Sequence, residues 1–153
     1  MCVHTERKGT FVRSIRHLMG QSIECVLCTS SGYIVAYSKS AQKLCLFWLN
    51  GQLIAEVPTE GGIECLTVNG SGSVLVCGMA SGFLQMRQLW SLELVSEFDL
   101  EAHGAITCLW CTEDQQFLMA GSSDGTFSVL ANPEERLRLL QSAIQVAPIL
   151  GAL

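Results

Sequence analysis

The stretch ITCLWC at residues 106–111 has two earlier counterparts in this chain, IECVLC at 23–28 and IECLTV at 63–68. Placing Ile23, Ile63 and Ile106 in register gives offsets of 40 and 43 residues. A repeat of about 40–45 residues built from short strands is the sequence signature of β-propeller blades. These three stretches therefore set the register in which the rest of the chain is interpreted.

Each repeat predicts the same succession of short strands, beginning with the register stretch and a turn rich in serine, glycine, asparagine or aspartate. Second strands are expected at 33–37, 73–77 and 117–120, and third strands at 44–48, 83–87 and 126–130. An outer strand precedes each unit, at 11–16, 52–57 and 92–98. The nearly continuous apolar content of the first two strands is typical of sheets buried on both faces, as between neighbouring blades.

The third unit, EAHGAITCLWCTEDQQFLMAGSSDGTFSVL, resembles a WD repeat. His103 falls at the position of the Gly-His signature, and Ser122 and Asp124 fall where the family has its Ser/Thr and its tight-turn Asp. The resemblance implies a structural hydrogen-bond network of these three residues that ties the outer loop to the strands. The network would be incomplete, because Leu130 stands at the position of the family's tryptophan.

The first unit resembles one particular group of WD-repeat proteins. Its motifs GTFVRSIRHL, GYIVAYS and LCLFWLNGQLIAEV resemble the C-terminal propeller of BEACH-domain proteins of the neurobeachin class. The later units continue the likeness with GFLQMRQLWSLELV and DGTFSVLANPEERLR, so that it covers residues 3–138. It implies a large cytoplasmic scaffold that acts in vesicle and membrane-protein trafficking.

We therefore predict an all-β fold, a partial β-propeller of three four-stranded WD-type blades in an open ring, with a short C-terminal helix. The blades would occupy residues 1–131, as units at about 11–51, 52–91 and 92–131, and the helix and tail residues 132–153. Asn132 is a good N-cap and Pro133 suits the first helical position. This helix is expected either to pack on the last blade or to bind a partner.

An open ring predicts docking surfaces. Closed propellers have 4–8 blades, and the outer strand of one WD unit completes the sheet of the preceding blade. Two blade faces and two strand edges would therefore be open, and open edges invite pairing with another chain. The expected partners are other proteins that bind blade loops and open strand edges, including the remaining blades of a propeller supplied in trans.

Composition excludes other partners. The chain has 153 residues, 49% of them hydrophobic and 15% charged, and a net charge of −5. A negative chain argues against a nucleic-acid-binding face. No segment approaches the ~18 consecutive apolar residues of a membrane-spanning helix. We expect no nucleic-acid partner, no direct membrane insertion, and a cytoplasmic location, with attachment to endomembranes only through partners.

Two Cys-x-x-Cys pairs, Cys25/Cys28 and Cys108/Cys111, suggest an alternative function as a metal- or redox-active thiol protein. Residues three apart in a strand point to opposite faces, whereas a zinc site brings both sulfurs to within ~2.3 Å of one ion. The middle repeat also has Val68 in place of the second cysteine. The position therefore favours a small apolar residue, and we expect no metal and no cofactor.

No catalytic residue is predicted, and the protein is expected not to be an enzyme. His103 is interpreted as a histidine that ties a loop, since no third residue to orient a catalytic histidine can be identified from spacing. Trp48 and Trp90 are the candidate contacts with a protein partner, because tryptophan is frequent at the centre of interfaces. Trp110 lies in a first strand and is expected in the core.

Overall fold

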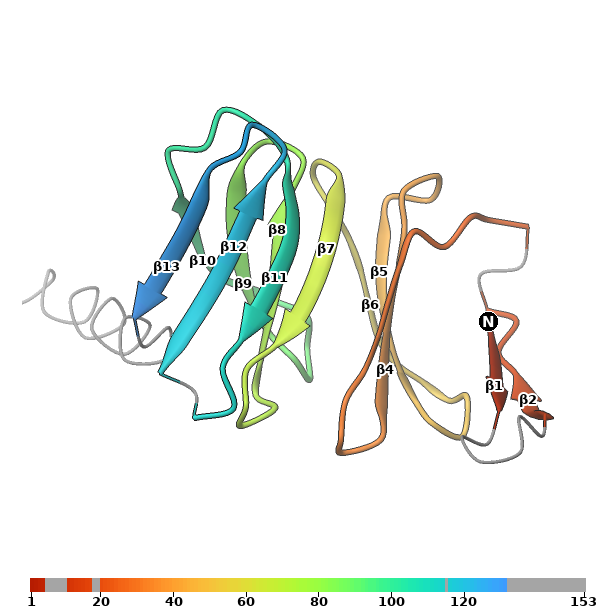
Figure 1. Ribbon diagram of the computed structural model, residues 1–153. Helices are drawn as coiled ribbons and strands as arrows, with labels where there is room; N and C mark the ends of the chain where they lie inside the picture. Colours follow the sequence, from red (N-terminus) through yellow and green to blue (C-terminus); the bar gives the residue numbers. More distant parts are fainter. Residues whose placement is uncertain (5–10, 18–19, 115, 132–153) are drawn as a thin grey trace, which may run out of the picture.

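The computed structural model describes residues 1–4, 11–17, 20–114 and 116–131, and every regular element in these ranges is a β-strand. Figure 1 shows them grouped into upright sheets that follow one another in chain order. The strands are β1 (Cys2–His4), β2 (Phe11–Ser14), β3 (Cys25–Cys28), β4 (Tyr33–Ser38), β5 (Lys43–Trp48), β6 (Leu53–Pro58), β7 (Ile63–Val68), β8 (Val74–Met79), β9 (Phe83–Gln88), β10 (Leu94–Asp99), β11 (Ile106–Cys111), β12 (Phe117–Ser122) and β13 (Phe127–Ala131).

Three antiparallel sheets form the blades. Two of them have four strands, in the orders β3-β4-β5-β6 and β7-β8-β9-β10, and the third has β11-β12-β13 in the described part of the chain. The first strands of neighbouring blades lie next to one another, because β7 contacts both β3 and β11. Since β1 and β13 lie at opposite ends of the row (Figure 1), the ring does not close within the described residues. The all-β, open-propeller prediction is confirmed.

The outer strands join the sheet that precedes them in the chain. β6 pairs with β5, and β10 pairs with β9. The outer strand expected at 11–16 is shorter, and as β2 it pairs with β1, a strand that the repeat did not predict. This two-stranded sheet stands before the first blade. The C-terminal helix predicted within 132–153 lies outside the described residues.

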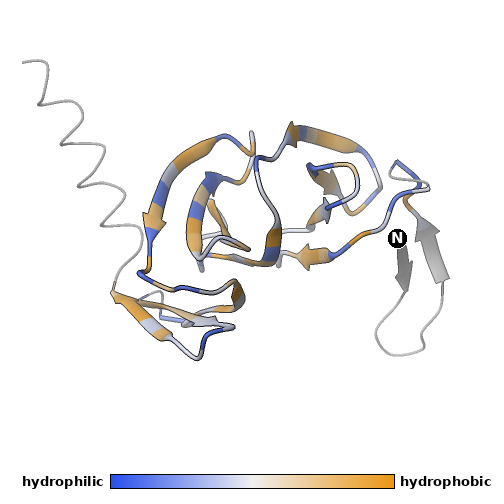
Figure 2. Cartoon of the chain, turned by 90° about the horizontal axis from the view of Figure 1, so that it is seen from above, coloured by the Kyte–Doolittle hydropathy of each residue, from blue (hydrophilic) through white to orange (hydrophobic). Residues whose placement is uncertain are grey.

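Alternation along the second and third strands builds two inter-blade cores. In β8, Leu75 and Cys77 pack toward the first blade, whereas Val76 between them packs toward the third. Both sets are buried, which explains why these strands are apolar at nearly every position. Figure 2 shows the hydrophobic colouring along the strands when the blades are seen from above. The fully buried members of the core between the first two blades include Val35, Tyr37, Leu44, Leu46, Ile63, Leu75, Cys77, Leu89 and Leu92.

Within the described part of the chain, no helix is long and apolar enough to cross a membrane.

Candidate functional site

A contact between first strands recurs from blade to blade. The Cys25 thiol lies 3.3 Å from the Glu64 carbonyl oxygen in the second blade, and the Cys65 thiol lies 3.2 Å from the Ile106 carbonyl oxygen in the third. In both pairs the thiol donates to the backbone of the next blade. Cys108 holds the equivalent position in the third blade and is exposed. The contact pattern is therefore interrupted where a following blade would stand.

The third sheet carries an exposed apolar face, which we call the open face and define as Cys108, Trp110, Phe117, Phe127 and Val129. Its large side chains are 43–65% exposed. They share a face because the register aligns Trp110 with Met119 and Val129 across the three strands. The opposite face of the same sheet packs on the second blade through Leu109, Leu118 and Leu130.

The prediction that Trp110 lies in the core is wrong. Its side chain is 62% exposed. In a first strand, alternate residues face the preceding and the following blade, and Trp110 faces the side on which the described chain supplies no blade. Trp110 does lie in a first strand, as predicted. A side chain on a strand is buried only where another sheet covers that face, and this the strand pattern does not show.

The face at the other end of the row is partly covered. Ile34, Ala36, Cys45 and Phe47 point away from the second blade and are buried under Ile15, with Met1 and Ile23 at the border. A cavity of about 300 Å³ remains between this N-terminal segment and the first sheet. The expectation of two open blade faces therefore holds for the third sheet, whereas the N-terminal segment partly closes the first.

Trp48 and Trp90 belong to one aromatic cluster, which spans the first and second blades and is completed by Tyr33. The Tyr33 ring stacks on Trp48, with centroids 4.3 Å apart, and meets Trp90 edge-to-face at 5.4 Å. The tryptophans remain 40% and 45% exposed. Rigid, half-exposed aromatic rings offer a large contact area at a low entropic cost. Sequence reasoning missed Tyr33, although aligning the hairpin of β4 and β5 pairs it directly with Trp48.

The structure brings Asp124 to the loop that carries His103. Asp124 Oδ2 accepts a hydrogen bond from the backbone N–H of His103 at 2.7 Å, and Oδ1 accepts one from the N–H of Thr126 at 2.8 Å. The N–H of Thr126, followed by its side chain and the N–H of His103, lowers the pKa of the Asp124 carboxyl to about 2. The loop is thus tied through the backbone of His103, while its imidazole is exposed.

Ser122, the third residue of the predicted network, lies beside this turn. Its hydroxyl is buried and makes no hydrogen bond within the usual distance among the described residues, although it adds the smallest contribution to the low pKa of Asp124. A Cβ on Gly104 would come within 3.1 Å of that hydroxyl, so the loop and the turn approach closely. Leu130, at the tryptophan position of the family, is buried.

Replacing Asp124 with alanine is expected to speed hydrogen exchange at the amides of His103 and Thr126 several-fold, because both lose their acceptor. The pKa of Asp124 is lowered from 3.8 to about 2, so its stabilisation is fully present above about pH 4 and is lost as the pH falls toward 2. Amide exchange followed by mass spectrometry or NMR measures this. Asp114→Ala, in another turn, is the control, and equal acceleration at His103 in that variant would contradict the assignment.

The Cys-x-x-Cys pairs are not arranged as metal or redox sites. Along β3 the exposure alternates, with Cys25 half-buried and Cys28 exposed, so the two thiols point to opposite faces. Burial raises the pKa of Cys25 and Cys111, and raises that of Cys65 to about 12. In the described part of the chain, neither pair belongs to a group of three or more potential ligands. Thiols held protonated are poor nucleophiles, so Cys25 and Cys111 are unsuited to redox exchange.

Antiparallel sheets of three or four strands that pack face to face in a row, with their first strands adjacent, define a β-propeller protein of the WD-repeat class. The family model of the neurobeachin β-propeller domain matches residues 1–139. The chain therefore belongs to the neurobeachin β-propeller family. It is 33% identical over 138 residues to BEACH domain-containing protein B of Arabidopsis thaliana, an alignment that covers 88% of this chain but 5% of that protein.

Solved structures share the fold at lower identity. The crystal structure of the RRP9 WD40 repeats superposes with a TM-score of 0.70 at 20% identity, over 80% of this chain and 38% of that one. The computationally designed Ika4 protein gives a TM-score of 0.60 at 17% identity, over 72% and 66% of the two chains. At these identities the likeness establishes the propeller fold alone.

Proposed function

We propose that this chain is a non-enzymatic interaction module that docks to other proteins through its open face and its aromatic cluster. Membership of the neurobeachin propeller family supports a role within a cytoplasmic scaffold for vesicle and membrane-protein trafficking, held on endomembranes through partners. Three groups with large pKa shifts also favour a structural role. Asp124 is held by backbone N–H groups, and Cys65 and Cys77 are buried.

The interrupted contact pattern at Cys108 carries this proposal. Two consecutive blade junctions use a first-strand thiol against the next blade's backbone, surrounded by apolar side chains. The open face repeats the thiol and the apolar surroundings without a neighbour in the described chain. Its occupant is therefore proposed to be a further WD-type blade, whose first strand would accept from Cys108 and cover Trp110.

The aromatic cluster would serve a second contact. Trp48 and Trp90 lie at a junction already filled by the first two blades, so a further blade cannot be their occupant. Their rings project from strand ends and turns, where propellers offer loops to partners. This surface would remain available after the open face has been covered.

The proposal is tested by mixing the full chain with a fragment of the Arabidopsis relative, taken from the sequence that flanks its matched region and chosen because it shows the same repeat spacing. We expect a one-to-one complex in sedimentation velocity, with new amide protection in β11 and β13. A double variant, Trp110→Lys with Phe127→Lys, should abolish the complex, because two charges would be buried at its centre. Both positions are largely exposed in the free chain, so folding should be retained.

The matched control is Trp48→Ser with Trp90→Ser, which removes the aromatic cluster and should leave the complex intact. Circular dichroism shows whether both variants stay folded. Failure of the unmodified chain to bind, or binding lost in the control and kept in the lysine variant, would overturn the assignment of the open face.

A further inference from the structure

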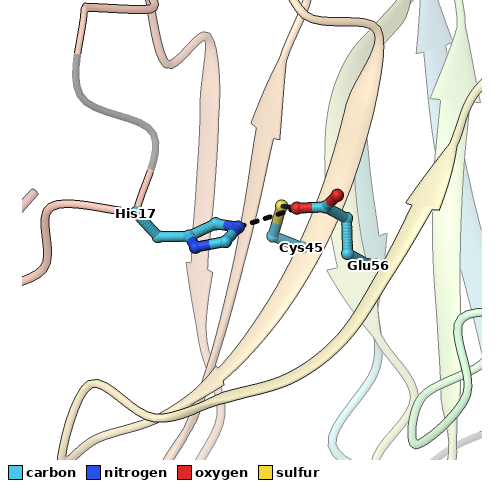
Figure 3. Close-up of side chains that lie close together, drawn as sticks. All are labelled: His17, Cys45 and Glu56. Atoms are coloured by element: carbon cyan, nitrogen blue, oxygen red, sulfur yellow. Dashed lines mark hydrogen bonds and ion pairs between the residues drawn. The ribbon is translucent and has the colours of Figure 1, made fainter.

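Three potential metal ligands converge at the outer side of the first blade. Cys45 lies on β5 directly opposite Glu56 on β6, and His17 reaches them from the segment that follows β2 (Figure 3). His17 Nε2 is 2.7 Å from Glu56 Oε2, and Cys45 Sγ is 3.6 Å from the same oxygen. One ligand atom from each residue lies within 4.8 Å of the other two.

We propose that His17, Cys45 and Glu56 bind one divalent zinc ion. Bond lengths of about 2.0–2.3 Å place tetrahedral ligand atoms roughly 3.3–3.8 Å apart. The sulfur and the carboxylate oxygen already have this spacing. The histidine and the carboxylate must separate by less than about 1 Å, and both side chains can move, since they are 39% and 28% exposed. Water from the solvent side would fill the fourth position.

Neighbouring groups orient these ligands. Lys43 Nζ donates to Glu56 Oε1 at 2.6 Å, which leaves Oε2 directed at His17 and Cys45. The His17 ring stands edge-to-face against Phe47, with centroids 5.7 Å apart. Cys45 is buried in the strand. Such outer contacts fix ligand orientation and are a regular part of protein metal sites.

The second blade shows what this position contains without a metal site. There Gln85 and Glu97 are the register equivalents of Cys45 and Glu56, and the Gln85 amide donates to the Glu97 carboxylate at 2.7 Å. An amide is a poor ligand for zinc. The first blade has a thiol at that place, and the N-terminal segment adds an imidazole. The ligand set is thus specific to one blade.

The donor set selects the ion. An imidazole, a thiol and a carboxylate together suit zinc, whereas magnesium and calcium prefer oxygen ligands alone. Burial and the adjacent Glu56 carboxylate raise the pKa of the Cys45 thiol to about 12. The ion must therefore displace this proton, so zinc binding liberates about one proton and tightens as the pH rises. The Lys43 ammonium repels the ion and limits the affinity. Bound zinc would fasten the N-terminal segment to the outer strand of the first blade.

The test titrates the full chain with Co²⁺ as a spectroscopic probe for zinc. We expect one equivalent of Co²⁺ to produce a thiolate-to-cobalt charge-transfer band. Adding Zn²⁺ should displace the cobalt and abolish the band. Cys45→Ser and His17→Ala should each lose the band or weaken binding at least about tenfold, the usual scale for losing part of a metal site.

Cys28→Ser is the matched control, since it removes an exposed thiol from another strand and should leave the titration unchanged. His17→Ala changes a surface residue, so it reports on the site even where Cys45→Ser impairs folding. A thiolate band that survives both ligand variants, a band lost in Cys28→Ser, or no band at a large excess of Co²⁺ would each overturn the assignment.

Discussion

Replacing Leu46 with alanine is expected to lower the free energy of unfolding by about 2–5 kcal/mol, the range for truncating a fully buried leucine. Leu46 has no exposed surface and packs in the core between the first and second blades. Its removal leaves a cavity that both sheets border, and neither can collapse into it without losing other contacts. Urea denaturation followed by circular dichroism measures the change.

Leu49→Ala provides the control for this prediction. The two leucines lie three residues apart, but Leu49 is 51% exposed, so its truncation is expected to cost well under 1 kcal/mol. Equal destabilisation by both variants would mean that the first two blades do not pack as described.

Replacing Gly78 with alanine is expected to cost about 1–3 kcal/mol, because the added methyl group overfills a packed junction. A Cβ at this position would lie 2.5 Å from Cys65 Sγ and 2.8 Å from Ile106 Cγ2. Ile106 is buried in the next blade and cannot move aside. The second and third blades would therefore have to separate slightly. The lost stability appears as a lower denaturant concentration at the midpoint of unfolding.

Two other glycines calibrate this effect. Gly62→Ala should be nearly neutral, since its nearest neighbour would be 3.5 Å away. Gly121 occupies the place of Gly78 in the third blade, where a Cβ would meet only Cys108 Sγ, at 2.6 Å. Cys108 is exposed and can turn away, so Gly121→Ala should cost less than Gly78→Ala. The reverse order would contradict the view that the following blade creates the crowding.

The local sequence pattern was sufficient to predict the repeat and the positions of its strands. The register of Ile23, Ile63 and Ile106 predicted the succession of strands, and the outer strands that became β6 and β10 paired with the preceding sheet as expected. Such features follow from alternation and turn residues, which act over a few positions of the chain. β1 was missed because three residues carry too little periodicity to be recognised.

The sequence alone could not show which distant segments of the chain come into contact. Trp110 is a large apolar residue of the kind found in cores, but it lies exposed. The blade that would cover it is not among the described strands. Trp90 joins Tyr33 and Trp48 only once the first two blades are side by side. The convergence of His17, Cys45 and Glu56 likewise depends on where the N-terminal segment crosses the first sheet.

The sequence by itself determined the blade: the order of its strands, the alternation that buries both faces, and the small apolar residue at each Ile-x-Cys register mark. Only the tertiary structure decided which faces are covered and which side chains meet. The physical reason is that strand pattern depends on near neighbours along the chain, whereas burial and convergence depend on a second surface. That surface is another blade for Cys65, the N-terminal segment for Cys45, and solvent for Cys108.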